Sequence, residues 1–282
     1  MSLSCPKPLI RVDALAGLLG RRTLRVIDVR HDLLHADAGR AAWLAGHIPG
    51  AVHLHLDDDL AGPTTGHNGR HPLPDPLECA LRLGAAGIGE QTHVVVYDDA
   101  GGAFAARLWW MLRWLGHDAV SVLDGGWQAW CAAGLPAHIG PEHTPGEVFV
   151  PRPRDGWIVG VSDIASGSWQ VVDARAPERF RGEIEPIDPV AGHIPGAVNR
   201  FHRNNLDETG CFKPPAILRT EFEALLGGRP ASALVSQCGS GVTACHNLLA
   251  MAVAGIDGAR LYPGSWSEWC SDPQRPVARG ES

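Results

Sequence analysis

The octapeptide AGHIPGAV at Ala45–Val52 recurs without change at Ala191–Val198, 146 residues further along the chain. Eight identical residues in the same order are not expected by chance. Upstream of each copy lies a second match, in which VIDVR at Val26–Arg30 corresponds to VVDAR at Val171–Arg175. The chain therefore contains two copies of one ancestral unit.

A third match lies downstream, where GGWQAW at Gly125–Trp130 corresponds to GSWSEW at Gly264–Trp269. A repeat period of this length indicates two whole domains, because the units of solenoid proteins are only about 20–50 residues long. The stretch between the copies is rich in proline, glycine and histidine, as is typical of a linker. We expect a first domain at residues 6–140, a linker at 141–156 and a second domain at 157–280.

Within each copy, short apolar stretches alternate with helical ones. This order predicts the α/β class, with each domain a mainly parallel sheet flanked by helices. Such sheets bind their ligands beyond the carboxyl ends of the strands. The main expected strands are 24–29, 93–97 and 119–123 in the first copy and 170–174, 233–237 and 259–262 in the second; the expected long helices are 103–115 and 243–254.

The composition limits the possible partners. The chain has 282 residues, of which 45% are hydrophobic and 20% charged, as in soluble globular proteins. A formal net charge of -7 argues against nucleic acid or an anionic membrane as the main partner. Seven scattered cysteines without a C-x-x-C pair are typical of free thiols in a reducing compartment. Since no apolar leader or span of about 20 apolar residues is present, we expect a cytoplasmic protein.

Cys238 lies where the apolar stretch 233–237 ends and the glycine-containing loop CGSGVT begins. Glycines let successive backbone N–H groups turn inward, and the following helix adds the positive end of its dipole. Such a loop favours a thiolate over a thiol, which predicts a nucleophilic cysteine rather than an inert buried one. The loop residues expected to hold the transferred group are Gly239, Gly241, Val242 and Thr243.

The first copy lacks this cysteine. When the copies are aligned on their tryptophan blocks, Asp99 falls at the position of Cys238. An aspartate cannot carry a transferred sulfur atom. We therefore expect the first domain to be catalytically inactive.

The paired AGHIPGAV segments, the loop CGSGVTA and the block GSWSEW resemble the two-domain sulfurtransferases, the rhodanese and 3-mercaptopyruvate sulfurtransferase family. The resemblance covers nearly the whole chain, and the loop is similar to that of the mercaptopyruvate branch. It implies transfer of sulfane sulfur from 3-mercaptopyruvate or thiosulfate through a persulfide on Cys238. The implied acceptor is a thiol, cyanide or thioredoxin, and no metal or organic cofactor is implied.

The resemblance also implies roles for individual residues. Ser240, His71 and Asp57 match a proton relay of the mercaptopyruvate branch, and Arg179 matches the arginine that binds the donor's anionic end. Neighbouring aspartates leave the choice of Asp57 open by one residue, and a solvated histidine and a surface carboxylate remain the alternative. Ile187 stands where that branch usually has a second substrate arginine, so the preferred donor remains open.

Other readings of the loop are less favourable. Cysteine phosphatases need an arginine six positions after the cysteine, and this chain has Ala244 there. A persulfide carrier that serves a partner protein is a further alternative. His53 and His55 would share one face of a strand, but they lack a cysteine or carboxylate at a recognised spacing, so we expect no metal site.

Overall fold

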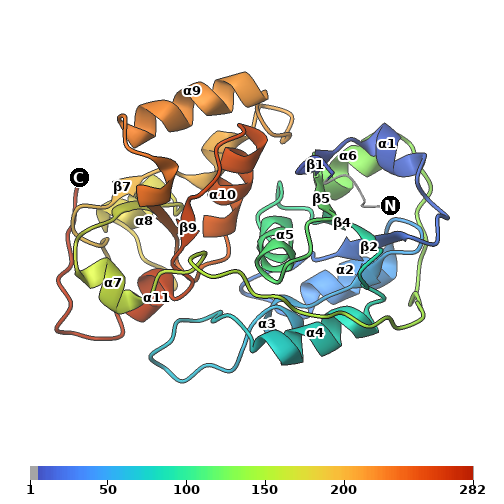
Figure 1. Ribbon diagram of the computed structural model, residues 1–282, viewed down its shortest axis with the longest axis horizontal. Coiled ribbons are helices and arrows are strands. Elements are labelled where there is room, and N and C mark those ends of the chain that lie inside the picture. The colour runs from blue at the N-terminus through green and yellow to red at the C-terminus, as the bar shows by residue number, and fades with distance from the viewer. Residues whose placement is uncertain (1–5, 282) are drawn as a thin grey trace. The chain divides into compact units, whose positions relative to one another are not determined.

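The computed structural model describes residues 6–281, which form two compact units (Figure 1). Two short segments belong to a different unit from their neighbours in sequence: 63–73 is part of unit 2, and 208–211 is part of unit 1. Unit 1 thus comprises residues 6–62, 74–154 and 208–211, and unit 2 comprises 63–73, 155–207 and 212–281.

Unit 1 is built on a five-stranded parallel sheet in the order β1-β5-β4-β2-β3. Its strands are β1 (Leu9–Ile10), β2 (Leu24–Asp28), β3 (Val52–His53), β4 (His93–Tyr97) and β5 (Val120–Leu123). Its helices are α1 (Val12–Ala16), α2 (Ala38–Ala45), α3 (Leu56–Asp59), α4 (Pro76–Ala85), α5 (Ala105–Trp114) and α6 (Gly126–Ala132).

Unit 2 is built on a four-stranded parallel sheet in the order β7-β6-β8-β9. Its strands are β6 (Gln170–Asp173), β7 (Val198–Asn199), β8 (Leu234–Gln237) and β9 (Arg260–Leu261). Its helices are α7 (Val161–Ala165), α8 (Pro177–Arg181), α9 (Pro215–Leu226), α10 (Ala244–Val253) and α11 (Ser265–Trp269), with 3-10 turns at His202–Asn205 and Ala231–Ala233.

Local sequence explains why these elements form where they do. All residues of β8 and four of the five in β4 are buried, as in a parallel strand covered on both faces. Asp75 caps α4 by accepting the N–H groups of Leu77 and Glu78, and α9 ends at Gly227, whose φ of +57° suits glycine. The predicted α/β architecture of two parallel sheets with flanking helices is confirmed.

A buried ion pair joins three repeated motifs in unit 2. Asp173, at the end of β6, accepts hydrogen bonds from Nε and Nη2 of Arg175, the shorter at 2.7 Å. The same Nη2 donates to the carbonyl of Gly192 at 2.8 Å, and the guanidinium carbon lies 4.9 Å from the ring centre of Trp266. A guanidinium thus connects the strand, the GHIPG segment and the tryptophan helix.

Unit 1 repeats this arrangement. Arg30 donates to Asp28, with a shortest distance of 2.6 Å, and to the carbonyl of Gly46 at 2.7 Å. Its guanidinium carbon lies 4.8 Å from the ring centre of Trp127, and Asp28 also accepts the hydroxyl of Tyr97 at 2.6 Å. The three sequence matches between the copies therefore mark one conserved contact network in each unit.

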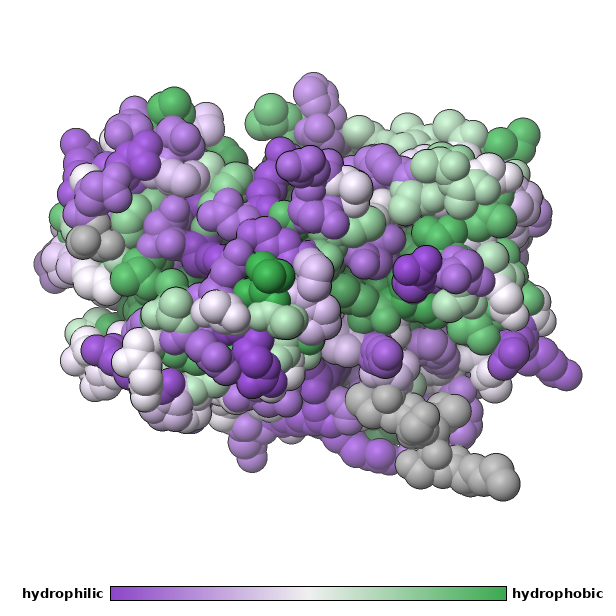
Figure 2. Space-filling view, turned by 90° about the horizontal axis from the view of Figure 1, so that it is seen from above, coloured by the Kyte–Doolittle hydropathy of each residue, from purple (hydrophilic) through white to green (hydrophobic). Residues whose placement is uncertain are grey.

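The surface is mixed in character. On the face shown in Figure 2, hydrophilic residues interrupt the hydrophobic ones. Among residues 6–281, no helix has the length and apolar character that a membrane span requires.

Removal of Arg30 tests the role of the buried pair. Arg30→Ala leaves the fully buried Asp28 without its cation, and losing one partner of a buried pair costs about 3–5 kcal/mol. We expect unit 1 to unfold at a clearly lower urea concentration. Arg11→Ala is the control, because the Arg11–Asp13 pair is exposed to solvent and should contribute little to stability. Equal effects of the two substitutions would mean that the buried Arg30–Asp28 pair does not stabilise unit 1.

Candidate active site

Cys238 directly follows β8 and is 2% exposed. The loop after it leads into α10, whose first residue is Ala244. The carboxyl end of a parallel strand and the amino end of a ten-residue helix thus flank the thiol. Both features favour an anion at this place, since the helix dipole and the first N–H groups of a helix stabilise negative charge.

Gly241 of the loop is required by its surroundings. Gly241 has a φ of +77°, and a Cβ atom there would lie 2.3 Å from the carbonyl oxygen of Pro263. A Cβ atom on Gly239 would lie 2.9 Å from Nη2 of Arg70. The predicted tight curl of this loop is therefore present, and a guanidinium covers it.

The corresponding position in unit 1 is Asp98, so the sequence-based alignment of Asp99 with Cys238 is wrong by one residue. The N–H of Trp127 donates to the carbonyl of Asp98 at 2.9 Å, as the N–H of Trp266 donates to that of Cys238 at 3.0 Å. The strand registers of the two sheets agree with this pairing. The sequence misled because the loop before α5 is one residue longer than that before α10.

In unit 1 the side chain of Asp98 itself accepts the N–H groups of the loop. The carboxylate of Asp98 accepts four backbone N–H groups at 2.8–2.9 Å, from Ala100, Gly102, Phe104 and Ala105. Burial raises the pKa of Asp98, and the four donors act in the opposite direction. A loop at this position of the fold is thus able to gather several N–H donors around one negatively charged group.

His71 and Ser240 meet beside the cysteine loop. Nδ1 of His71 lies 2.7 Å from Oγ of Ser240, and both side chains are buried. His71 comes from segment 63–73, which belongs to unit 2 although it precedes most of unit 1 in sequence. An imidazole hydrogen-bonded to a hydroxyl can move a proton to or from a substrate.

Asp57 belongs to unit 1, where it is the second residue of the four-residue helix α3. Its carboxylate lies 3.9 Å from Nε2 of His31 and 4.0 Å from Nδ1 of His55. Its part in the relay remains a prediction.

His31, His55 and Asp57 are the residues that could bind a cation, since one donor atom of each lies within 4.8 Å of the others. Donors around a tetrahedral zinc ion lie only about 3.4 Å apart, given bonds of about 2.0–2.1 Å. The distances from the Asp57 carboxylate, 3.9 Å to His31 and 4.0 Å to His55, are wider than this. The expectation that His53 and His55 share a strand is wrong, because β3 ends at His53 and His55 caps α3.

Two arginines and two acids form a cluster next to Gly239. Arg179 donates from Nη2 to Glu185 at 2.6 Å and to Asp188 at 3.0 Å, and Arg70 pairs with Asp188 through Nη1. Both Nη atoms of Arg179 lie 3.6 Å from a Cβ built on Gly239. The acids therefore hold both guanidinium groups against the loop that begins at Cys238.

The pKa values of Glu185 and Asp188 shift in opposite directions within this cluster. Burial raises the pKa of Glu185, but the hydrogen bonds and charge of Arg179, together with backbone N–H donors at Asp188 and Ile187, leave that pKa below the ordinary value. Burial keeps the pKa of Asp188 above its ordinary value, although Arg70 and Arg179 oppose this. Arg70 is not among the site residues that the sequence predicts; its position directly before His71 was the one available signal.

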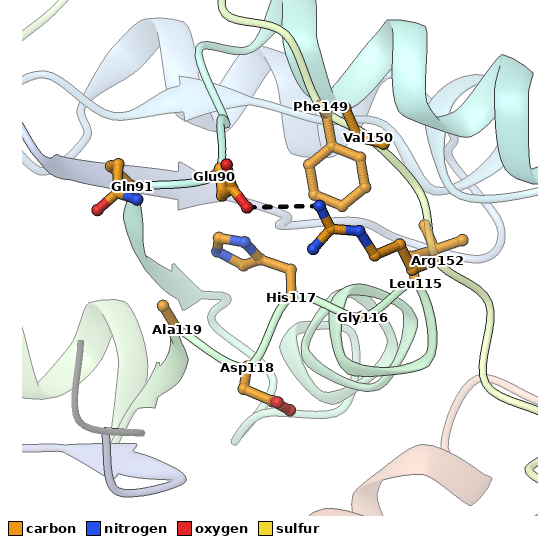
Figure 3. A pocket seen from close by; sticks show the side chains of 10 residues that line it. All are labelled: Glu90, Gln91, Leu115, Gly116, His117, Asp118, Ala119, Phe149, Val150 and Arg152. Carbon is orange, nitrogen blue, oxygen red and sulfur yellow. Dashed lines mark hydrogen bonds and ion pairs between the residues drawn. The ribbon is translucent and has the colours of Figure 1, made fainter. Parts of the chain in front are cut away.

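A separate cavity of about 280 Å³ lies in unit 1, before the amino ends of β4 and β5 (Figure 3). The buried Nε2 of His117 has no hydrogen-bond partner among the described residues, and burial lowers the pKa of this histidine. Glu90 and Arg152, both largely exposed, pair at 3.4 Å beside it. The cavity lies at the amino ends of the strands, whereas Asp98 lies at the carboxyl end of β4. Its lining residues are Glu90, Gln91, Leu115, Gly116, His117, Asp118, Ala119, Phe149, Val150 and Arg152.

Comparison with known proteins shows the family of this chain. The chain matches the Rhodanese-like domain twice, over residues 11–133 and 161–272. The chain belongs to the rhodanese-like family. It is 49% identical over 280 residues to a Pseudomonas aeruginosa protein named "Probable 3-mercaptopyruvate sulfurtransferase", covering 97% of this chain and 98% of that protein.

Two further relatives extend the comparison. Bovine thiosulfate sulfurtransferase is 35% identical over 271 residues, which cover 92% of this chain and 89% of that protein. The solved structure of 3-mercaptopyruvate sulfurtransferase from Leishmania major superposes with a TM-score of 0.85 at 30% identity, covering 96% of this chain and 75% of that one. The predicted sulfurtransferase function is confirmed at the level of sulfur transfer.

A substitution at Gly241 tests the geometry of the loop. Gly241→Ala combines a left-handed backbone, which costs about 1–2 kcal/mol with a Cβ, with a clash against Pro263 worth about 1–3 kcal/mol more. Gly196→Ala is the matched control, because its φ is +78° and nothing lies within 4 Å of the added atom. We expect urea unfolding to show a larger loss for Gly241→Ala. Equal losses would mean that the loop does not approach Pro263.

Proposed function

We propose that this sulfurtransferase moves the sulfur of 3-mercaptopyruvate, through a persulfide on Cys238, to a thiol or cyanide. The observation that carries the proposal is the His71–Ser240 contact beside the cysteine loop, because a proton-transfer pair suits a donor whose leaving group is a carbanion. The name of the Pseudomonas aeruginosa relative supports the same donor.

In the first step, the Cys238 thiolate attacks the sulfur atom of mercaptopyruvate. An S–S bond forms, the donor's C–S bond breaks, and its electron pair leaves with the pyruvate enolate. The persulfide on Cys238 keeps the transferred sulfur until an acceptor thiolate attacks the outer sulfur atom and restores the cysteine thiolate. The N–H groups of residues 239–243 stabilise the negative charge in both sulfur forms.

The relay acts on the leaving group. The hydroxyl of Ser240 polarises the donor's ketone oxygen and supplies the proton that turns the enolate into pyruvate, while His71 replaces that proton. Asp57 is the carboxylate that would orient His71. Thiosulfate needs no such proton, because sulfite leaves with its own negative charge.

The donor's carboxylate binds to Arg179 and Arg70. Arg179 uses Nε and Nη2 for the acids Glu185 and Asp188, and Arg70 uses Nη1 for Asp188. This leaves Nη1 of Arg179 and Nη2 of Arg70 on the side of Gly239. Arg70 thus supplies, from a distant segment, the second guanidinium group that is missing at Ile187.

The acceptor is a small thiol, cyanide or a dithiol protein such as thioredoxin. The odd number of scattered cysteines supports a reducing, cytoplasmic setting in which such acceptors are abundant. Thiosulfate is a second donor candidate, because the bovine relative is named for it.

Replacing the nucleophile gives the first test of this function. Cys238→Ser should abolish sulfur transfer from both donors and the mass gain of one sulfur atom after donor treatment, because a serine cannot hold sulfane sulfur. Cys245→Ala is the control, since Cys245 lies within α10 and its thiol faces the carbonyl of Gly241 at 3.3 Å. Turnover by Cys238→Ser would refute the proposal.

Donor-specific kinetics give the second test. Arg70→Ala and Arg179→Ala should each raise KM about 10- to 150-fold, the range that corresponds to charged hydrogen bonds of about 1.5–3 kcal/mol. Ser240→Ala should lower kcat for mercaptopyruvate about 100-fold and spare thiosulfate. Arg181→Ala, which removes an exposed pair with Glu183, is the control. An unchanged KM in Arg70→Ala would exclude Arg70 from donor binding, and equal slowing of both donors by Ser240→Ala would exclude the relay.

A further inference from the structure

Ser265 is the one non-glycine residue with a positive φ in residues 6–281. Its φ is 55°, in the left-handed region that a side chain normally disfavours, and it is fully buried. The equivalent residue of unit 1, at the start of α6, is Gly126 with a φ of 56°. Unit 2 therefore keeps a serine at a backbone position for which unit 1 has the unstrained residue.

The hydroxyl of Ser265 makes two hydrogen bonds, one as donor and one as acceptor. Oγ donates to the carbonyl of Tyr262 at 2.8 Å and accepts the backbone N–H of Cys238 at 3.1 Å. The next residue, Trp266, donates its N–H to the carbonyl of Cys238 at 3.0 Å. Two consecutive residues at the start of α11 thus hold both backbone polar groups of the nucleophile.

Unit 1 has only one of these two hydrogen bonds to the first loop residue. Trp127 bonds to the carbonyl of Asp98 as Trp266 does to that of Cys238, but Gly126 has no hydroxyl to offer. A Cβ atom on Gly126 would lie 2.4 Å from the carbonyl oxygen of Asp98, so the inactive loop leaves no room for a serine. The extra hydrogen bond therefore occurs in the unit whose loop begins with Cys238.

We infer that Ser265 is a positioning residue for sulfur transfer: its hydroxyl fixes the peptide of Cys238 so that the thiolate points into the N–H groups of the following loop. Strained backbone conformations are retained where the surrounding structure uses them, and errors of about 1 Å in the position of a reacting group cost about 100-fold in rate. The inference rests on the proposed function of Cys238.

The decisive variant is Ser265→Gly, which removes the hydroxyl and also relieves the backbone strain. We expect its unfolding midpoint to match or exceed that of the wild type, while kcat/KM for both donors falls about 10- to 100-fold. The rate of Cys238 alkylation by iodoacetamide at a fixed neutral pH, followed by peptide mass spectrometry, should fall, because the loosened peptide no longer holds the sulfur toward the N–H groups of the loop. Alkylation needs no sulfur donor, so it reports on the thiolate directly.

Controls separate this inference from the proposed function. Ser271→Ala removes a hydroxyl that donates to a carbonyl three residues back, as Ser265 does, but touches Glu268 instead of Cys238. It should behave as wild type. If Ser265→Gly keeps wild-type kinetics and alkylation while Cys238→Ser is inactive, the inference is wrong and the proposed function stands. Sulfur transfer by Cys238→Ser would instead refute the proposed function.

Discussion

A buried aspartate–arginine pair organises each unit at the end of one strand. Charges at 0–4% exposure are stable only when every polar atom around them is paired, and the arginine meets this demand by bonding at once to its aspartate and to a glycine carbonyl. Its face lies against a tryptophan. The strand end, the GHIPG segment and the tryptophan helix are thereby fixed relative to one another.

This frame determines where the loop after the neighbouring strand can lie. The tryptophan that packs on the arginine also donates its backbone N–H to the first loop residue, Asp98 in unit 1 and Cys238 in unit 2. The same scaffold thus presents two different groups at one place. In unit 1 the loop closes on its own carboxylate, whereas in unit 2 it begins with the thiol of Cys238.

Electrostatic balance distinguishes the site of unit 2. Glu185 and Asp188 neutralise much of the charge of Arg70 and Arg179, which lowers the cost of keeping two guanidinium groups near each other. The acids also orient these groups, so that Nη2 of Arg70 and both Nη atoms of Arg179 lie near Gly239. Rigid, pre-oriented donors bind an anion with little loss of side-chain entropy.

The sequence alone determined the duplication and the α/β class, and it predicted Cys238 as the nucleophile. These follow from local patterns: an identical octapeptide, apolar strand stretches, and a cysteine beside glycines whose spacing reports backbone geometry. The pairing of His71 with Ser240 came from family resemblance, since 169 residues separate them and no periodicity links them. Tertiary structure alone decided that Asp98 is the counterpart of Cys238, that Arg70 joins Arg179 at Asp188, and that the Ser265 hydroxyl accepts the backbone N–H of Cys238. The physical reason is that loop length, side-chain hydrogen bonds and ion pairs depend on chain segments brought together by folding, whereas periodicity and glycine content act within a few neighbouring residues.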